Sequence, residues 1–428
     1  MMRGRLKHPL VAGLAVALLV TACGGDDDDS SADADAGGNG AYGANGANVT
    51  IYSSLPLQGA SRPIGEALVN GMQLAFEQAG NATGDVEVEY ISLDDSTAQA
   101  GAWTPEAESA NARRAIQDDS AVAYLGTFNS GAAAIAIPLL NEAGMAMLSP
   151  GNTAVGLTSD APGADTDAGE PEIYYPTGER NYARIVPKDT VQGAALATIM
   201  SEDGCTRVAI LHDKEVYGAG LAENVDIAAE GLDLEVVSNE GIDGRSANYR
   251  SVASALAADN VDCFVFSGIT ANGAVQLFKD VSAALPEAKL YGPDGVAEST
   301  FYDEADGGLP ADVAAKTKVT VATLSPDEYS EEGRQFFADY EAEYGDANPN
   351  PYAIYGYEAA RLILDVLDRA EDPTDRASVL RALFETADRE SVLGTYGIDE
   401  NGDTTLTTYG VYGIEGGELV FERSVESG

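Results

Sequence analysis

The chain has 428 residues and is strongly acidic, with 70 Asp and Glu against 24 Lys and Arg and a formal net charge of −46 at pH 7. This charge excludes nucleic acid as a partner, because a polyanion would be repelled by the surface. Hydrophobic residues make up 45% of the chain, and the length suffices for two lobes. No apolar segment after residue 22 is long enough to span a bilayer. Composition therefore predicts a globular protein.

Residues 1–22 predict an export signal. Arg3, Arg5 and Lys7 precede the apolar run 10–20, and Val20-Thr21-Ala22-Cys23 matches a lipobox. Cleavage would leave Cys23 as an acylated first residue, and its lipid would be the only membrane anchor. The alternative is an ordinary signal peptide that has a cysteine nearby. We expect an extracytoplasmic lipoprotein, at the cell surface or in the periplasm.

Residues 23–47 are predicted to form a disordered tether, since they are rich in Gly, Asp, Ser and Ala and can build no core. A metal site in the acidic run 26–29 is not expected, because consecutive side chains of a flexible segment converge poorly. No metal and no cofactor are predicted for the chain.

From residue 48 onward, strands and helices alternate, which predicts parallel sheets. The first elements expected are strands at 49–54 and 86–93 and helices at 65–79, 105–117 and 132–143. After Pro187 the pattern starts again, with helices at 191–202, 217–230 and 249–258 and strands at 207–211, 234–238 and 264–267. Helices at 331–344 and 352–369 follow, and then an Asn401-Gly402 hairpin turn between strands at 396–398 and 406–412. The fold class is therefore α/β, with two doubly wound parallel-sheet lobes.

Two loops of the first lobe carry the strongest functional signal. The stretches 124–131 and 147–153 each read as an apolar strand that ends at small and hydroxyl residues, and Ser130 then starts a helix. In a parallel sheet both strand ends open into one crevice, where backbone N–H groups and the helix dipole favour a carboxylate. Ser130 and Thr153 can each add a hydroxyl. The alternative is that both residues are only helix caps.

These stretches belong to an ordered series of motifs. The others are Asn70-Gly71, Asp94-Asp95, the segments 184–189 and 212–221, and Gly292-Pro-Asp294-Gly-Val296. With this series, residues 49 to about 425 resemble the periplasmic Leu/Ile/Val-binding proteins, the solute receptors of branched-chain amino acid ABC transporters. The resemblance implies a type I periplasmic-binding fold with a three-segment hinge, crossed near 185–189, 320–324 and 392–397. Lobe 1 would comprise 48–186 and 323–393, and lobe 2 would comprise 187–322 and 394–428.

The resemblance and the chemistry of an amino acid together suggest the ligand site. A carboxylate and an ammonium both lose water in a closed cleft, so each needs replacement partners. We assign the carboxylate to Ser130 and Thr153, and the ammonium to Asp294 and the Gly151 carbonyl. Since Asp294 lies on the second lobe, the ligand's two charges would bridge the cleft and favour closure.

The expected pocket wall departs from the family pattern. The usual glutamate at the ammonium position is Asp294, and the aromatic residues expected near Ile64 and Ile269 are absent. The remaining wall residues are Phe128, Asn129 and Tyr217, although Tyr217 could instead pack over neighbouring glycines. A branched aliphatic amino acid is favoured, and amides, urea-like solutes and aromatic acids stay open as ligands.

Besides Cys23, the chain has two cysteines, Cys205 before one strand and Cys263 at the start of another. In a doubly wound lobe these strands are neighbours, so we expect a disulfide in an oxidising compartment. The alternative is two unlinked small apolar residues.

Other classes of function are weaker. His212 is the only histidine after the leader, and no Gly-x-Ser-x-Gly elbow or His/Cys cluster is present, so neither a hydrolase nor a zinc site is expected. A dinucleotide site at 218–223 would place Glu223 where a glycine is required. We expect a monomeric binding protein, not an enzyme, that serves an ABC permease or, alternatively, a membrane sensor.

Overall fold

The computed structural model describes residues 47–427. The predicted signal peptide, the lipidated Cys23 and the tether up to residue 46 lie outside this range. Among the described residues, no helix combines the length and the apolar character that crossing a membrane requires.

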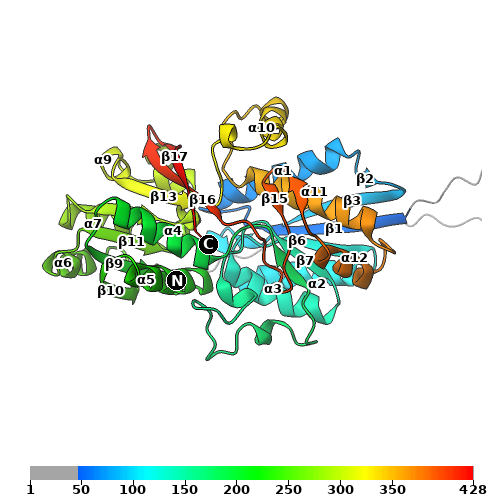
Figure 1. Cartoon of the computed structure of the whole chain (residues 1–428), viewed down its shortest axis with the longest axis horizontal. Coiled ribbons are helices and arrows are strands. Elements are labelled where there is room, and N and C mark those ends of the chain that lie inside the picture. The colour runs from blue at the N-terminus through cyan, green and yellow to red at the C-terminus, as the bar shows by residue number, and fades with distance from the viewer. Residues whose placement is uncertain (1–46, 428) are drawn as a thin grey trace, which may run out of the picture. The chain divides into compact units, whose positions relative to one another are not determined.

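Six strands form the first sheet, in the order β2-β3-β1-β6-β7-β8 (Figure 1). All neighbours are parallel except β2 and β3. Its strands are β1 (Ala47–Leu55), β2 (Ala82–Thr83), β3 (Val86–Asp94), β6 (Ala121–Gly126), β7 (Ala146–Ser149) and β8 (Tyr182–Arg184). The residues of β6 and β7 are buried throughout, as expected for strands covered by helices on both faces.

Helices cover both faces of this sheet and complete the first lobe. They are α1 (Arg62–Gln78), α2 (Pro105–Gln117), α3 (Ser130–Glu142), α10 (Glu331–Tyr344), α11 (Ala353–Arg369) and α12 (Arg376–Phe384). The pairs α1–α11 and α2–α3 pack together, on opposite sides of the sheet in Figure 1. Gly71 allows the first pair to approach closely, because an added Cβ would lie 2.2 Å from the carbonyl oxygen of Ala353.

Seven strands form the second sheet, in the order β10-β9-β11-β12-β13-β16-β17. The last two pairings are antiparallel and the others are parallel. Its strands are β9 (Arg207–His212), β10 (Glu235–Gly241), β11 (Cys263–Ser267), β12 (Lys289–Gly292), β13 (Thr317–Val321), β16 (Thr408–Glu415) and β17 (Glu418–Glu426). The helices of this second lobe are α4 (Asp189–Glu202), α5 (Val216–Glu230), α6 (Arg250–Ala258), α7 (Ala274–Ala284), α8 (Ser299–Tyr302) and α9 (Ala311–Ala314). Two further hairpins are short: β4 (Ser96–Thr97) with β5 (Ala102–Trp103), and β14 (Arg389–Ser391) with β15 (Gly394–Tyr396).

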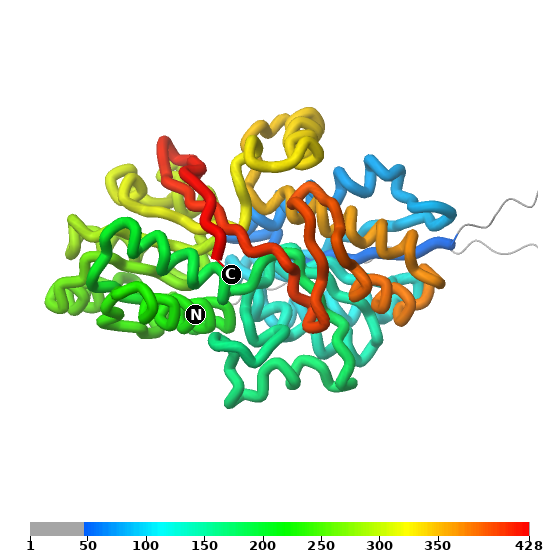
Figure 2. Tube along the Cα trace, viewed as in Figure 1, coloured from blue at the N-terminus to red at the C-terminus, as the bar shows by residue number. Residues whose placement is uncertain are grey.

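The chain passes between the two sheets three times, as the trace in Figure 2 shows. It leaves the first sheet after β8, returns to α10–α12 after β13, and joins the second sheet again at β16. The third crossing comes later than the expected 392–397. Tyr396 donates a hydrogen bond to Glu358 on α11 (2.8 Å), and the N–H of Arg184 bonds to the carbonyl of Gly402 (2.9 Å). These contacts hold the segment 394–403, which we expected in lobe 2, against the first lobe.

The turn at Gly402 forms, but the predicted hairpin around it does not. The Gly402 N–H bonds to the carbonyl of Asp399 (3.0 Å), and a single bridge pairs Ile398 with Thr404. The strand expected at 406–412 begins at Thr408 and pairs instead with β13 and with β17, which was not predicted.

A disulfide joins Cys205 to Cys263, with a Cα–Cα distance of 5.8 Å. Cys205 lies just before β9, and Cys263 begins β11, which pairs with β9 in parallel. The bond therefore ties two neighbouring strands at one end of the second sheet, in a buried position.

Replacing both Cys205 and Cys263 by Ala should lower the free energy of unfolding by about 2–4 kcal/mol, because the bond restricts the unfolded chain. Urea denaturation of both proteins, with and without reductant, measures this. Reductant should destabilise the wild type and leave the variant unchanged; equal stability of the two oxidised proteins would contradict the prediction.

Candidate ligand-binding site

A narrow cavity lies between the two lobes. The first lobe contributes the start of α3, the loop after β7 and the side chain of Trp103. The second lobe contributes the loops that follow its parallel strands. The lining residues are Trp103, Phe128, Asn129, Ser130, Gly131, Gly151, Thr153, Glu215, Tyr217, Ile269, Asp294 and Gly295. The structure thus brings the predicted site residues together, with one exception.

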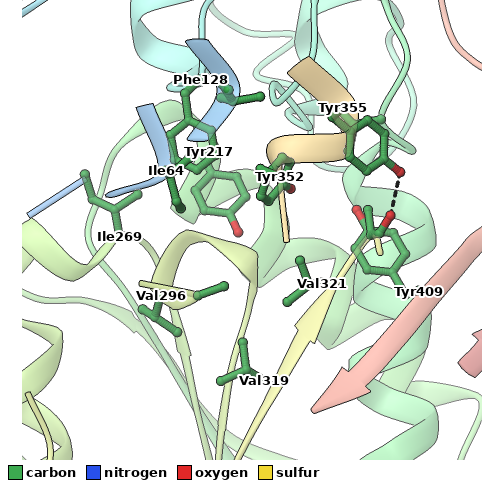
Figure 3. Packing of buried hydrophobic residues seen from close by; sticks show 14 of the residues in the cluster. Ile64, Phe128, Tyr217, Ile269, Val296, Val319, Val321, Tyr352, Tyr355 and Tyr409 are labelled. Carbon is green, nitrogen blue, oxygen red and sulfur yellow. Dashed lines mark hydrogen bonds between the residues drawn. The ribbon is translucent and has the colours of Figure 1, made fainter. Parts of the chain in front are cut away.

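The exception is Ile64, which is fully buried on α1 and does not line the cavity. Figure 3 shows it among the buried residues of the apolar cluster that continues from one lobe into the other. Ile64 therefore packs within the buried cluster, and in this structure it is not part of the cavity wall that we expected.

The first-lobe side of the cavity is the N-terminal turn of α3. The helix starts at Ser130, and the carbonyl of Asn129 accepts the N–H groups of Ala132 and Ala133 (3.0 and 3.1 Å). The first N–H groups of a helix have no intrahelical acceptor and lie at the positive end of its dipole. Together with the Ser130 hydroxyl, they form a place suited to a carboxylate.

The loop after β7 is fixed beside this turn. The Ser149 hydroxyl accepts hydrogen bonds from the N–H groups of Gly151 (3.1 Å) and Asn152 (2.8 Å), and the Asn152 side chain donates to the carbonyl of Phe128 (2.9 Å). The N–H of Ala154 in turn donates to the Ser130 hydroxyl (3.3 Å). Thr153 is thereby held at the cavity next to Ser130.

Arg184, which the sequence did not single out for the site, positions this loop. Its guanidinium is fully buried, and Nη1 donates to the carbonyls of Asn152 (3.3 Å) and Ala154 (2.8 Å), the two neighbours of Thr153. Its Nε donates to Asp403 (2.8 Å), which also pairs with Lys188 (2.7 Å). The loop is therefore coupled to the third crossing through a buried ion pair.

The Arg184–Asp403 pair should make stability depend on pH in the acid range. Burial would raise the pKa of Asp403, but the charges of Arg184 and Lys188 lower it to about 2. Since the folded pKa lies below the ordinary value of about 3.9, this stabilisation is complete above pH 4 and is lost as the pH falls towards 2.

Asp403→Asn should therefore cost about 2–5 kcal/mol at pH 7, where it leaves Arg184 buried without its anion. The difference from the wild type should shrink between pH 4 and pH 2, as measured by chemical denaturation across that range. A difference independent of pH would contradict the assignment.

The second-lobe side centres on Asp294, which lies in a 3₁₀ turn (Asp294–Val296) after β12 and is 2% exposed. Its Oδ1 accepts the Tyr217 hydroxyl (2.7 Å) and its Oδ2 accepts the Tyr352 hydroxyl (2.5 Å). Burial raises the pKa of Asp294, and these two hydrogen bonds only partly offset the rise. Each carboxylate oxygen keeps a lone pair that can accept from a ligand.

Tyr352 was not predicted as a site residue. It precedes α11 in the first lobe, so its bond to Asp294 crosses between the lobes. Its ring also meets Phe128 edge-on, with centroids 5.5 Å apart (Figure 3). No sequence motif marks this tyrosine, which lies 58 positions from Asp294.

Asp189, the first residue of α4, adds a second buried acid near the site. Its side chain is fully buried, and neither carboxylate oxygen has a hydrogen-bond partner among the described residues. Its backbone N–H donates to the carbonyl of Thr153 (2.9 Å). Burial and then the charge of Asp294 raise the pKa of Asp189 well above its ordinary value. Among residues 47–427, no Lys, Arg or His lines the cavity, so the arrangement favours a positively charged group on the ligand.

Comparison with known proteins places the chain in a family. Residues 49–418 match the model of the periplasmic binding protein family. The Leu/Ile/Val-binding protein BraC3 of Rhizobium johnstonii is 24% identical over 375 residues, covering 87% of this chain and 94% of the relative. The amino acid binding protein of Pseudomonas aeruginosa is 25% identical over 372 residues, covering 86% and 90%.

Solved structures show the same fold. The leucine-binding protein LivK of Thermotoga maritima aligns with a TM-score of 0.75 at 21% identity, covering 88% of this chain and 99% of that one. A solute-binding protein of R. palustris in complex with benzoate aligns with a TM-score of 0.72 at 20% identity, covering 89% and 97%. The family match confirms the resemblance drawn from the motifs, and these structures confirm the type I fold. The chain belongs to the periplasmic binding protein family and is similar to its Leu/Ile/Val-binding members.

Proposed function

We propose that this protein is an extracytoplasmic solute-binding lipoprotein that captures an amino acid, or a close analogue, and delivers it to an ABC permease. The observation that carries the proposal is the pairing of opposite sites across one cavity. The N-terminal turn of α3 favours an anion on the first lobe, and Asp294 favours a cation on the second.

An α-amino acid satisfies both sites. Its carboxylate would accept hydrogen bonds from Ser130, Thr153 and backbone N–H groups, and its ammonium would donate to Asp294 and the Gly151 carbonyl. Both groups would then replace the water they lose on entering the cavity. Because the partners come from two lobes, binding would stabilise the closed arrangement. We expect the protein to act as a monomer, as members of the resembled family do.

Phe128 and Ile269 give the cavity an apolar wall, and with the Leu/Ile/Val-binding relatives they make branched-chain amino acids the first class to test. The second candidate is an aromatic acid, because a structural neighbour is in complex with benzoate. An aromatic acid lacks an ammonium, so its binding would not depend on the charge of Asp294. Amides and urea-like solutes form a third class, for which Asp294 would be only a hydrogen-bond acceptor.

Asp294→Asn should weaken amino acid binding by about 2–5 kcal/mol, since the ammonium would be buried without its anion. Asp294→Glu, which restores the usual family residue, is the matched control and should keep most of the affinity. Isothermal titration with leucine, isoleucine, valine, benzoate and acetamide measures both variants. Amino acid binding that Asp294→Asn leaves unchanged would remove this residue from the site.

Lipid anchoring at Cys23 is part of the proposal, and a permease is its expected membrane partner. Cys23→Ser should abolish incorporation of labelled fatty acid into the exported protein, because the lipid is attached through the sulfur of Cys23. Metabolic labelling followed by immunoprecipitation measures this; a Cys23→Ser protein that still incorporates the label would contradict it. A histidine kinase or chemoreceptor encoded beside this protein, in place of a permease and ATPases, would favour the sensing alternative.

We assign the cavity to binding and not to catalysis. Its lining offers the hydroxyls of Ser130 and Thr153, but it contains no histidine or lysine to activate them as nucleophiles. A hydrolase is therefore the weakest alternative, and turnover of an amide by the purified protein would revive it.

A further inference from the structure

Glu215 is a second carboxylate that lines the cavity, besides Asp294. It is the residue before α5 in the second lobe and is half-buried. Its side chain forms no hydrogen bond or ion pair with any residue in the described range 47–427. This distinguishes it from Asp294, whose oxygens both accept tyrosine hydroxyls.

The backbone of Glu215 is held firmly. Its N–H donates to Oδ1 of Asp213 (3.1 Å), and Oδ2 of Asp213 accepts the Ile269 N–H (3.1 Å) and the Asn272 side chain (2.9 Å). The loops after β9 and β11 are thus joined through one buried carboxylate. The Cα of Glu215 is therefore held at the mouth of the cavity by the fold of the second lobe.

The Glu215 carboxylate reaches the first lobe. A Cβ added to Gly131, in the first turn of α3, would lie 3.5 Å from Oε2 of Glu215 and 2.6 Å from Cζ2 of Trp103. The side chains of Trp103, from the first lobe, and Glu215, from the second lobe, therefore both approach Gly131. Gly131 leaves the space that both side chains occupy.

These residues lie at one end of the cavity. Trp103, Glu215 and Ile269 line both the inner cavity and an adjoining outer groove, whereas Asp294 and Thr153 line only the inner cavity. Arg245 lines the outer groove but not the inner cavity, so Glu215 is the charged residue shared by the two. An amino acid held by Asp294 and Thr153 would extend its side chain along the remaining lining. The far end of that side chain would then come to Glu215.

The charges decide which side chain fits there. Burial and then the charge of Asp213 raise the pKa of Glu215, so its ionised form is already disfavoured. A purely hydrocarbon side chain would remove more water from this carboxylate without offering it a replacement hydrogen bond. A side chain that ends in an N–H donor would pair with Glu215, and a cationic donor would pair most strongly. Trp103 and Ile269 would then contact the aliphatic stem of that side chain.

We propose that Glu215 is a specificity-determining residue, which selects an α-amino acid whose unbranched side chain ends in an N–H donor. This inference rests on the proposed function, because it assumes that the α-amino and carboxylate groups bind at Asp294 and Ser130. It deepens that function by naming the side chain, and it favours a different class from the branched-chain amino acids that the relatives suggest.

The experiment is isothermal titration of the purified full chain with lysine, ornithine, glutamine, norleucine and leucine. Norleucine has the carbon chain of lysine without the terminal amine. At least one of the three N–H-bearing amino acids should bind the wild type about tenfold or more tightly than norleucine. Glu215→Gln should reduce that preference and keep or improve the binding of norleucine.

Glu106→Gln is the matched control, since Glu106 is exposed and lines only the outer groove. It makes the same change of charge and should keep the wild-type preference. The inference is overturned if norleucine or leucine binds the wild type as tightly as the N–H-bearing amino acids, or if Glu215→Gln keeps their advantage. If no amino acid binds at all, the proposed function fails together with the inference, so the two failures are distinguishable.

Discussion

The guanidinium of Arg184 connects the cavity to the crossings between the lobes, and much of the site depends on it. It bonds to the carbonyls on either side of Thr153 and to Asp403. A fully buried cation must be neutralised, so Asp403 has to lie against the first lobe, and the third crossing is delayed accordingly. The same interaction that orders the ligand loop therefore decides where the chain leaves the first lobe.

The second feature of the site is an excess of buried negative charge. Asp294, Asp189 and Glu215 lie in or beside a cavity that no basic side chain lines. Burial raises the pKa of all three carboxyl groups, which means that their ionised forms are held at a cost. A positively charged ligand group would reduce this cost by pairing with them, which is the physical basis of the binding mode that we propose.

Family membership and local chemistry answer different questions about this protein. The family match establishes the fold and the general position of the cleft, while identities near 24% leave the ligand to the residues of this chain. Two acidic residues bear most directly on the choice of ligand. They are Asp294, which accepts hydrogen bonds from two tyrosines, and Glu215, which lies beside Trp103. In our proposal the first holds the α-amino group of the ligand, and the second selects its side chain.

The sequence by itself determined the alternating elements, the two lobes and the strand-end loops that carry Ser130 and Thr153, because hydrophobic periodicity and helix starts are local properties. It also placed Cys205 and Cys263 on strands that turned out to be neighbours. Only the tertiary structure decided which distant side chains meet. Tyr352 reaches Asp294 from 58 positions away, and Arg184 reaches Asp403 from 219. Such contacts depend on how loops from separate lobes approach in space, and no local pattern of residues records that approach.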